Sequence, residues 1–280
     1  MDRHLSKEFG EKPKATPTII TDSDQNGYWN ALSKEYHKIT KISCNDFHYG
    51  PQIPGENALR LLPKFKHGDT SLELGCGGAQ NSIWLAKQGL ICMAVDISEE
   101  QLGHAKNLAA KHKVNIVLEK ASLNDFSNVI KGREFNFVHS SHALEFVQKP
   151  ESVVQKMAEC VSPGGLLMIS TVHPLYNGEW MDVEVENAKG EIIESSGQFV
   201  ANYFSPPDDI RNDNGEFGVS RAYPLSKWFK WIKQAGLNII AMEEPMMTKY
   251  APYTSKDWAE QDGFLDSIPA TIIFVAQKPV

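Results

Sequence analysis

Short apolar runs alternate with longer segments of helical character over much of this chain. The apolar runs occupy residues 71–74, 90–95, 115–119, 135–140 and 166–172. Helices are predicted between them, at residues 80–88, 98–112 and 151–161. Strands that are apolar almost throughout and alternate with helices are typical of a parallel sheet covered on both faces. The pattern therefore predicts an α/β fold with a doubly wound, mostly parallel sheet.

The N-terminal segment has a different character. Residues 1–21 carry charges and two prolines with little hydrophobic pattern, so we expect a flexible tail. From residue 25 the apolar positions lie three or four apart, which predicts a helix, with Trp29, Leu32, Tyr36 and Ile39 on one face. We interpret residues 22–66 as a helical unit that either packs on the core or forms a lid over a bound ligand.

A second irregular segment interrupts the alternation at residues 175–222. Residues 182–186 alternate acidic and apolar side chains, as a half-exposed strand does, and glycines and prolines punctuate the rest. We interpret this segment as an inserted β-rich cap over the active site. The main domain then comprises residues 67–174 and 223–280, with its last two strands near residues 237–242 and 271–276.

Composition narrows the functional classes. The chain has 280 residues, 41% of them hydrophobic, and a formal net charge of −7, which argues against a broad nucleic-acid interface. Its four cysteines show no metal-ligand spacing, so we expect reduced cysteines, no bound metal and a cytoplasmic protein. No N-terminal apolar run or stretch of 18 apolar residues is present, so we expect neither a signal peptide nor a membrane partner.

A glycine turn follows the first predicted strand of the main domain. Gly75 and Gly77 lack side chains where backbone must approach a ligand, and the next helix offers unpaired N–H groups at its first turn. Asp96 ends the next strand, where a carboxylate can accept hydrogen bonds from a ribose. A dinucleotide motif would need a third glycine where Gln80 stands, and Glu73 precedes the turn instead.

In four blocks the sequence resembles class I S-adenosylmethionine-dependent methyltransferases. The blocks are residues 71–81, 94–98, 135–145 and 162–170. The glycine turn G-C-G-G-x-Q-N and the segment H-Y-G-P at residues 48–51 are similar to a small-molecule, type 11-like subgroup. The resemblance implies a Rossmann-like sheet with an antiparallel edge strand, S-adenosylmethionine as cofactor and S-adenosylhomocysteine as product.

The resemblance also implies site residues. The cofactor-binding candidates are Tyr36, Glu73, Gly75, Gly77, Gln80, Asp96, Ile97, Gln101, Ser122, Leu123 and Ser140. Ile97 and Leu123 would enclose the adenine, and Asp96 would bind the ribose hydroxyls. Ser122 stands where the family usually has an acidic residue for the adenine amino group, so either Asp125 or backbone groups would replace it. The substrate-binding candidates are Tyr28, Tyr49, Tyr203 and Tyr223.

The implied reaction is attack by a lone pair of the acceptor on a methyl group carried by a sulfonium. The protein must mainly orient the reactants, and it needs a general base only if the nucleophile carries a proton that must leave. His142 and His173 follow the fourth and fifth strands and are the candidates for base or substrate anchor. A histidine held by structural hydrogen bonds remains the alternative for each.

The same residues also bear on several alternatives to a small-molecule methyltransferase. Nucleic-acid adenine methyltransferases carry (N/D)-P-P-(Y/F) after the fourth strand, where this chain has Ser140-Ser141-His142-Ala143. Gln80 and Glu73 disfavour a dinucleotide-dependent reductase. We therefore expect methyl transfer to an oxygen or nitrogen of a small-molecule acceptor, with a non-catalytic S-adenosylmethionine-binding partner protein as the alternative. The acceptor stays undefined, and a homodimer stays open.

Overall fold

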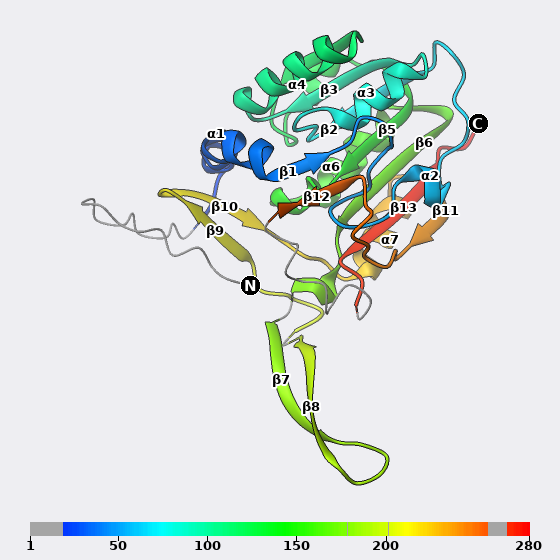
Figure 1. Ribbon diagram of the computed structural model, residues 1–280. Coiled ribbons are helices and arrows are strands. Elements are labelled where there is room, and N and C mark those ends of the chain that lie inside the picture. Colours follow the sequence, from blue (N-terminus) through cyan, green and yellow to red (C-terminus); the bar gives the residue numbers. More distant parts are fainter. Residues whose placement is uncertain (1–18, 178, 201, 257–267) are drawn as a thin grey trace.

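The computed structural model describes residues 19–177, 179–200, 202–256 and 268–280. Most of the predicted tail, residues 1–18, lies outside the described residues. A seven-stranded sheet forms the centre of the protein, in the order β11-β13-β6-β5-β2-β3-β4 (Figure 1). Its strands are β2 (Thr70–Leu74), β3 (Ile91–Asp96), β4 (Ile116–Lys120), β5 (Phe135–Ser141), β6 (Val161–Val172), β11 (Asn238–Glu243) and β13 (Thr271–Gln277).

Helices cover both faces of this sheet, as predicted. They are α2 (Glu56–Leu59), α3 (Gln80–Lys87), α4 (Glu99–His112), α5 (Ser127–Ile130), α6 (Pro150–Glu159) and α7 (Leu225–Gln234), with short 3-10 turns η1 (Leu144–Phe146) and η2 (Pro174–Asn177). Alternate residues of each strand pack on opposite sides. Leu72 and Met93 join the core under α6 and α7, whereas Cys92 and Ala94 pack under α3 and α4.

The strand directions confirm the Rossmann-like prediction. Strands β4, β3, β2, β5 and β6 run parallel, and β13 pairs antiparallel with both β6 and the edge strand β11. The chain moves outward from β2 to β4 and then returns to β5 on the other side of β2. Ligands of such sheets bind at the carboxyl ends of the strands, where the strand order reverses. The site is therefore expected above the ends of β2, β3 and β5.

The N-terminal and inserted segments form smaller units beside the sheet. Helix α1 (Asp22–Ile39) leads into β1 (Thr40–Ile42), which pairs with β12 (Tyr253–Ser255). The inserted segment folds into two hairpins, β7 (Glu179–Glu186) with β8 (Ile192–Phe199), and β9 (Asp209–Asp213) with β10 (Glu216–Ser220). Figure 1 shows the β7–β8 hairpin projecting away from the sheet, whereas β9 and β10 lie beside α1.

Three further properties bear on the predictions from composition. All four cysteines are free and buried. No helix in the described ranges combines the length and apolar character needed to cross a lipid bilayer. Within those same ranges, no group of three or more His, Cys, Asp or Glu side chains is placed to share a metal ion.

Candidate functional site

The glycine turn joins β2 to α3 in a conformation that side chains disfavour. Gly75 has φ +70° and Gly77 has φ +50°, both in the left-handed region. A Cβ at Gly75 would overlap the side chain of Ala143. The backbone N–H groups of Gly75 and Cys76 donate to the carbonyl of Val95, at 2.8 and 3.1 Å. The turn is thus fixed against the end of β3.

Asp96 lies directly beside this turn. One carboxylate oxygen accepts from the Gly77 N–H at 2.8 Å and the other from the Ser98 N–H at 2.9 Å. Burial raises the pKa of Asp96 above its usual value, although the backbone N–H groups of Ser98, Gly77 and Ile97 act in the opposite direction. A carboxylate has about four acceptor sites, so acceptor capacity remains for a hydroxyl.

Helix α4 begins beside Asp96 with an N-cap at Ser98, whose hydroxyl accepts from the Gln101 N–H at 3.1 Å. The Gln101 side chain returns no bond to the Ser98 N–H, which donates to Asp96. The Gln101 Oε1 atom instead lies 2.6 Å from Nε2 of His37, on helix α1. Gln101 therefore links α4 to α1, and a Cβ at Gly77 would lie 3.6 Å from its Oε1.

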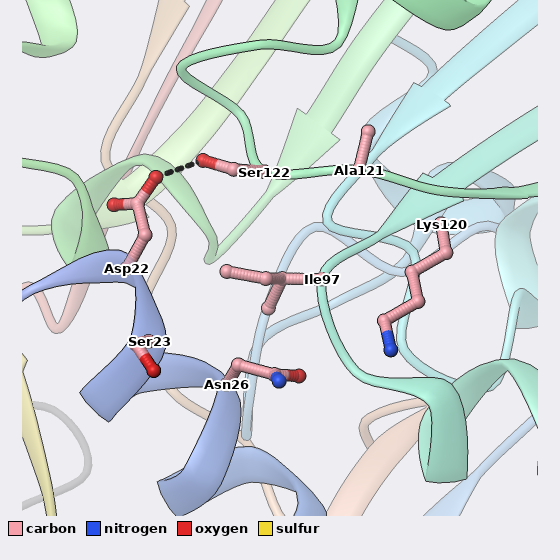
Figure 2. A pocket seen from close by; sticks show the side chains of 7 residues that line it. All are labelled: Asp22, Ser23, Asn26, Ile97, Lys120, Ala121 and Ser122. Atoms are coloured by element: carbon pink, nitrogen blue, oxygen red, sulfur yellow. Dashed lines mark hydrogen bonds between the residues drawn. The ribbon is translucent and has the colours of Figure 1, made fainter.

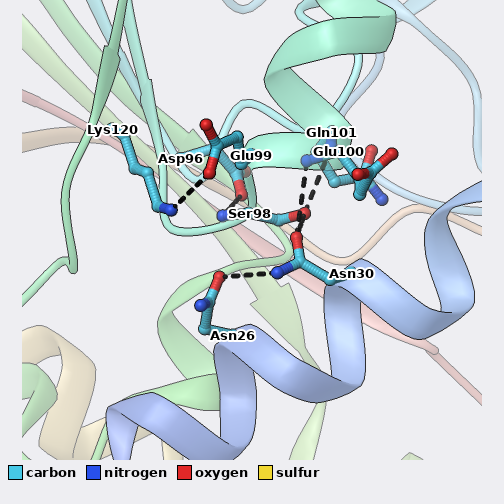
Figure 3. A network of polar contacts seen from close by, with 8 residues as sticks. All are labelled: Asn26, Asn30, Asp96, Ser98, Glu99, Glu100, Gln101 and Lys120. Atoms are coloured by element: carbon cyan, nitrogen blue, oxygen red, sulfur yellow. Dashed lines mark hydrogen bonds and ion pairs between the residues drawn. The ribbon is translucent and has the colours of Figure 1, made fainter.

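Helix α1 crosses the carboxyl ends of β3 and β4, and its polar side chains bind there. The Ser98 hydroxyl donates to Oδ1 of Asn30 at 2.7 Å, and Asn26 contacts Asn30 one turn earlier (Figure 3). His37 stacks on His104 of α4 with ring centroids 3.5 Å apart. Burial, and then the neighbouring His104, lower the pKa of His37 to about 4, so the stacked pair is neutral near pH 7.

A pocket of about 350 Å³ opens between α1 and the loop that follows β4. It is lined by Asp22, Ser23, Asn26, Ile97, Lys120, Ala121 and Ser122 (Figure 2). Two predicted residues, Ile97 and Ser122, are thus brought together. Leu123 lies next to them along the loop, and its side chain reaches within 3.9 Å of the position of a Cβ at Gly75.

Three predicted cofactor residues direct their side chains into the protein itself. Glu73 accepts from both the backbone N–H and the hydroxyl of Ser82 in α3. The Ser140 hydroxyl donates to the carbonyl of Leu74 at 2.9 Å. The Gln80 side chain packs over Gly78, where a Cβ would lie 2.6 Å from its Nε2. These side chains hold the glycine turn in place.

The H-Y-G-P segment is fastened to the glycine turn by one side chain. Oδ1 of Asn81 accepts from the His48 N–H at 2.8 Å, and its Nδ2 donates to the His48 carbonyl at 2.9 Å. Asn81 is the last residue of the G-C-G-G-x-Q-N motif, and it is fully buried. The side chain of Asn81 therefore joins the glycine-turn motif to the H-Y-G-P segment.

His142 lies at the end of β5 in a strained backbone conformation, with φ +52°. Its Nδ1 lies 3.0 Å from Oε1 of the buried Glu145, and its Nε2 lies 2.9 Å from the Thr271 hydroxyl. Glu145 in turn accepts from the Thr171 hydroxyl at 3.0 Å. The carboxylate fixes the proton on Nδ1 and leaves the Nε2 lone pair facing a hydroxyl that can rotate away.

His173 has a different environment. Its Nε2 donates to Glu244 at 2.8 Å, and its Nδ1 accepts from the Leu175 N–H at 3.2 Å. Burial lowers the pKa of His173, with Glu244 acting in the opposite direction. With both nitrogens engaged and only 2% of the residue exposed, His173 has no nitrogen available to an acceptor. Of the two histidines, His142 is the one whose Nε2 faces a hydroxyl rather than a carboxylate.

The four tyrosines predicted to bind substrate do not gather at one place. Tyr49 is fully buried and donates to Glu56. Tyr203 accepts from the backbone at the start of α7, and Tyr223 packs on the tryptophans of that helix. Tyr28 is buried against Gly218 of β10.

Tyr36, predicted to bind cofactor, contacts the Tyr253 hydroxyl, and Tyr253 packs edge-on against the His48 ring. Tyr36 therefore connects helix α1, through Tyr253, to the H-Y-G-P segment.

Sequence reasoning missed several polar residues of the site. Asp22, Asn30 and His37 on α1 carry the contacts between that helix and the ends of β3 and β4. Glu145 lay inside a block used for the resemblance but had no role assigned. Its place three residues after His142, on the same turn of chain, was the available signal.

The chain was also compared with known proteins. A family model described as a methyltransferase domain matches residues 47–242. A ubiquinone biosynthesis O-methyltransferase of Coxiella burnetii is 32% identical over 106 residues, which cover 38% of this chain and 44% of that protein. This match thus spans less than half of the length of the Coxiella burnetii relative.

Two further matches cover more of the chain. A protein of the same name from Dechloromonas aromatica is 27% identical over 205 residues, 73% of this chain and 78% of the relative. Among solved structures, a candidate S-adenosylmethionine-dependent methyltransferase from Listeria monocytogenes has a TM-score of 0.62 at 23% identity, covering 79% of this chain and 94% of the other. That likeness establishes the shared fold.

Proposed function

Because the chain belongs to the methyltransferase-domain family, we propose that it transfers a methyl group from S-adenosylmethionine to an oxygen or nitrogen of a small-molecule acceptor. The observation that carries this proposal is the contact between Asp96 and the Gly77 N–H, at the rim of a pocket lined by Ile97. In this proposal the Asp96 carboxylate binds the ribose, and the pocket lined by Ile97 holds the base.

The residues present fit this cofactor. The glycine turn lies at the carboxyl end of β2, where a polar amino-acid moiety would bind, and Gly77 carries no side chain that would fill the space before it. Asp96 keeps acceptor capacity for a ribose hydroxyl, and Ile97 offers an apolar surface to adenine. Glu73 would act indirectly, by holding the turn through Ser82.

The cofactor, when bound, supplies an electrophilic methyl group on a sulfonium. The chain's own residues orient the acceptor, exclude water and accept a proton where the acceptor is a hydroxyl. We assign the last role to Nε2 of His142, with Glu145 stabilising the imidazolium that forms. Thr271 would release Nε2 by rotation of its hydroxyl.

Oxygen is the favoured methyl acceptor. The relatives described above are named O-methyltransferases, and a hydroxyl nucleophile is the kind that needs the base that His142 can provide. We further propose that α1 is a lid and that the β9–β10 hairpin forms the part of the inserted cap beside it. The partner is then a free small molecule, with no nucleic acid or membrane involved.

The first test is ligand-dependent thermal stability. S-adenosylmethionine and S-adenosylhomocysteine should each add about 2.7 kcal/mol at 100 times their Kd, which raises Tm by several degrees. NAD should have no effect, and Asp96→Ala should reduce the response. A response to NAD alone would overturn the proposal.

A second arm separates catalysis from binding. His142→Gln should keep the stabilisation by S-adenosylhomocysteine and lower kcat for a hydroxyl acceptor. Full stabilisation of the wild type with no methyl transfer to any acceptor would favour a non-catalytic cofactor-binding protein.

A further inference from the structure

We propose that Asp22 of the lid helix accepts a hydrogen bond from the exocyclic amino group of the cofactor's adenine. The lid helix then recognises the base as well as covering it. This inference rests on the proposed use of an adenosyl cofactor. It assigns the contact with the adenine amino group to a residue outside the glycine turn and the strand ends.

The pocket lies next to the proposed ribose site. Ile97, which lines the pocket, follows Asp96 directly in the chain. A nucleoside whose ribose is bound by Asp96 can therefore place its base against Ile97 and Ala121. The volume of about 350 Å³ is ample for one purine.

The loop after β4 offers no carboxylate to this pocket. Ser122 stands at the expected acidic position, and its hydroxyl donates to Asp22. Asp125, the alternative considered from sequence, is exposed, and its backbone N–H closes a turn onto the Ser122 carbonyl. Of the residues that line the pocket, Asp22 is the acidic one.

The Asp22 carboxylate is held in a defined orientation. Ser122 donates to Oδ2, and Nδ2 of Asn124 donates to Oδ1 at 2.9 Å and to Oδ2 at 3.0 Å. These three contacts leave one acceptor site on Oδ1 from a total of about four. An N–H donor that reaches that site would form its bond without displacing Ser122 or Asn124.

Selectivity for the amino group follows from this chemistry. A carboxylate accepts hydrogen bonds and cannot donate one, so it favours the 6-amino group of adenine over the 6-oxo group of hypoxanthine. The contact also joins the N-terminus of α1 to the base, so that closing the lid and binding adenine become one event.

The test compares two ligands that differ only at this group. Dissociation constants for S-adenosylhomocysteine and S-inosylhomocysteine are measured by calorimetry with the full chain, in the wild type, Asp22→Asn and Ser122→Ala. The wild type should prefer the adenosyl ligand by roughly tenfold or more, as expected for a hydrogen bond to a charged group. Asp22→Asn, which presents an amide donor, should lose or reverse that preference.

Ser122→Ala distinguishes recognition of the adenine amino group from a contact that only attaches α1 to the loop after β4. It removes one support of Asp22 but keeps the carboxylate, so both ligands should weaken by a similar factor and the preference should persist. Equal weakening of both ligands in Asp22→Asn would overturn the inference and leave Asp22 as a structural contact. Failure of the wild type to bind either ligand would instead overturn the proposed cofactor, and this inference with it.

Discussion

Asn81 offers the sharpest test of how the site is held together. Its side chain is fully buried and makes a two-way contact with the backbone of His48, at 2.8 and 2.9 Å. Asn81→Ala removes the hydrogen-bond partners of the His48 N–H and of the His48 carbonyl at once. The Ser141 hydroxyl still donates to the His48 carbonyl at 3.3 Å, so the N–H group of His48 is the one left unpaired.

The magnitude follows from these contacts. A buried N–H without a partner costs about 1–3 kcal/mol, and the lost bond to the carbonyl adds about 1 kcal/mol. The free energy of unfolding should therefore fall by about 2–4 kcal/mol. For a chain of this size each kcal/mol lowers Tm by about 2–4 °C, so a fall of roughly 5–15 °C is expected.

Chemical denaturation and thermal melting measure this loss, with kcat/KM as a second readout because the H-Y-G-P segment packs against His142. Asn81→Asp is the matched control: it keeps an acceptor for the His48 N–H but loses the donor to its carbonyl. A buried aspartic acid can donate while it holds its proton, so this variant should be least damaged at acidic pH. A loss below about 1 kcal/mol in Asn81→Ala, with unchanged activity, would refute the reasoning.

Two further predictions concern buried groups near the site. Burial raises the pKa of Glu73 from 4.5 to about 7, so the folded protein keeps this proton after the unfolded chain has lost it. Stability should therefore decline between about pH 4.5 and 7, by about 3 kcal/mol from this group, and Glu73→Gln should flatten that part of a Tm-against-pH curve. Gly50→Ala would place a Cβ against Nε2 of His142, so kcat should fall by up to roughly 100-fold while the Kd of S-adenosylhomocysteine is unchanged. An unchanged kcat would argue against His142 as the base.

The sequence predicted the central sheet well because local periodicity determines which segments are strands and helices. The glycine turn and Asp96 were predictable for a related reason. Consecutive parallel strands bring their carboxyl ends to one edge of the sheet, so residues at those ends must lie close together. The start of β6 was less well defined, because its pairing with β5 is interrupted near Gly164 and resumes at Leu166.

Polar partners across long separations were not predictable in the same way. The Ser122 hydroxyl donates to Asp22, 100 residues earlier, and Ser98 donates to Asn30, 68 residues earlier. Neither pairing leaves a periodic signal. Tyr49 shows the converse error, since a tyrosine in a glycine- and proline-rich loop suggested an exposed role. The loop folds inward because Asn81 holds its backbone, and the ring packs in the core.

The lid helix illustrates how the strength of these contacts suits the proposed function. Three of its contacts lie near the strand ends: Ser122 donates to Asp22, Ser98 donates to Asn30, and His37 lies against Gln101. Asn124 donates two further bonds to Asp22, and Gln25 donates to the carbonyls of Phe146 and Val219. Tyr28 packs on the inserted hairpin at Gly218, and Trp29 packs edge-on against Phe146. At a net 0.5–1.5 kcal/mol or so for each hydrogen bond, the first three contacts together are similar to the stabilisation of about 2.7 kcal/mol that a ligand supplies at 100 times its Kd. In the proposed function, a cofactor bound beneath α1 therefore stabilises the closed position of the helix by about as much as those three contacts do.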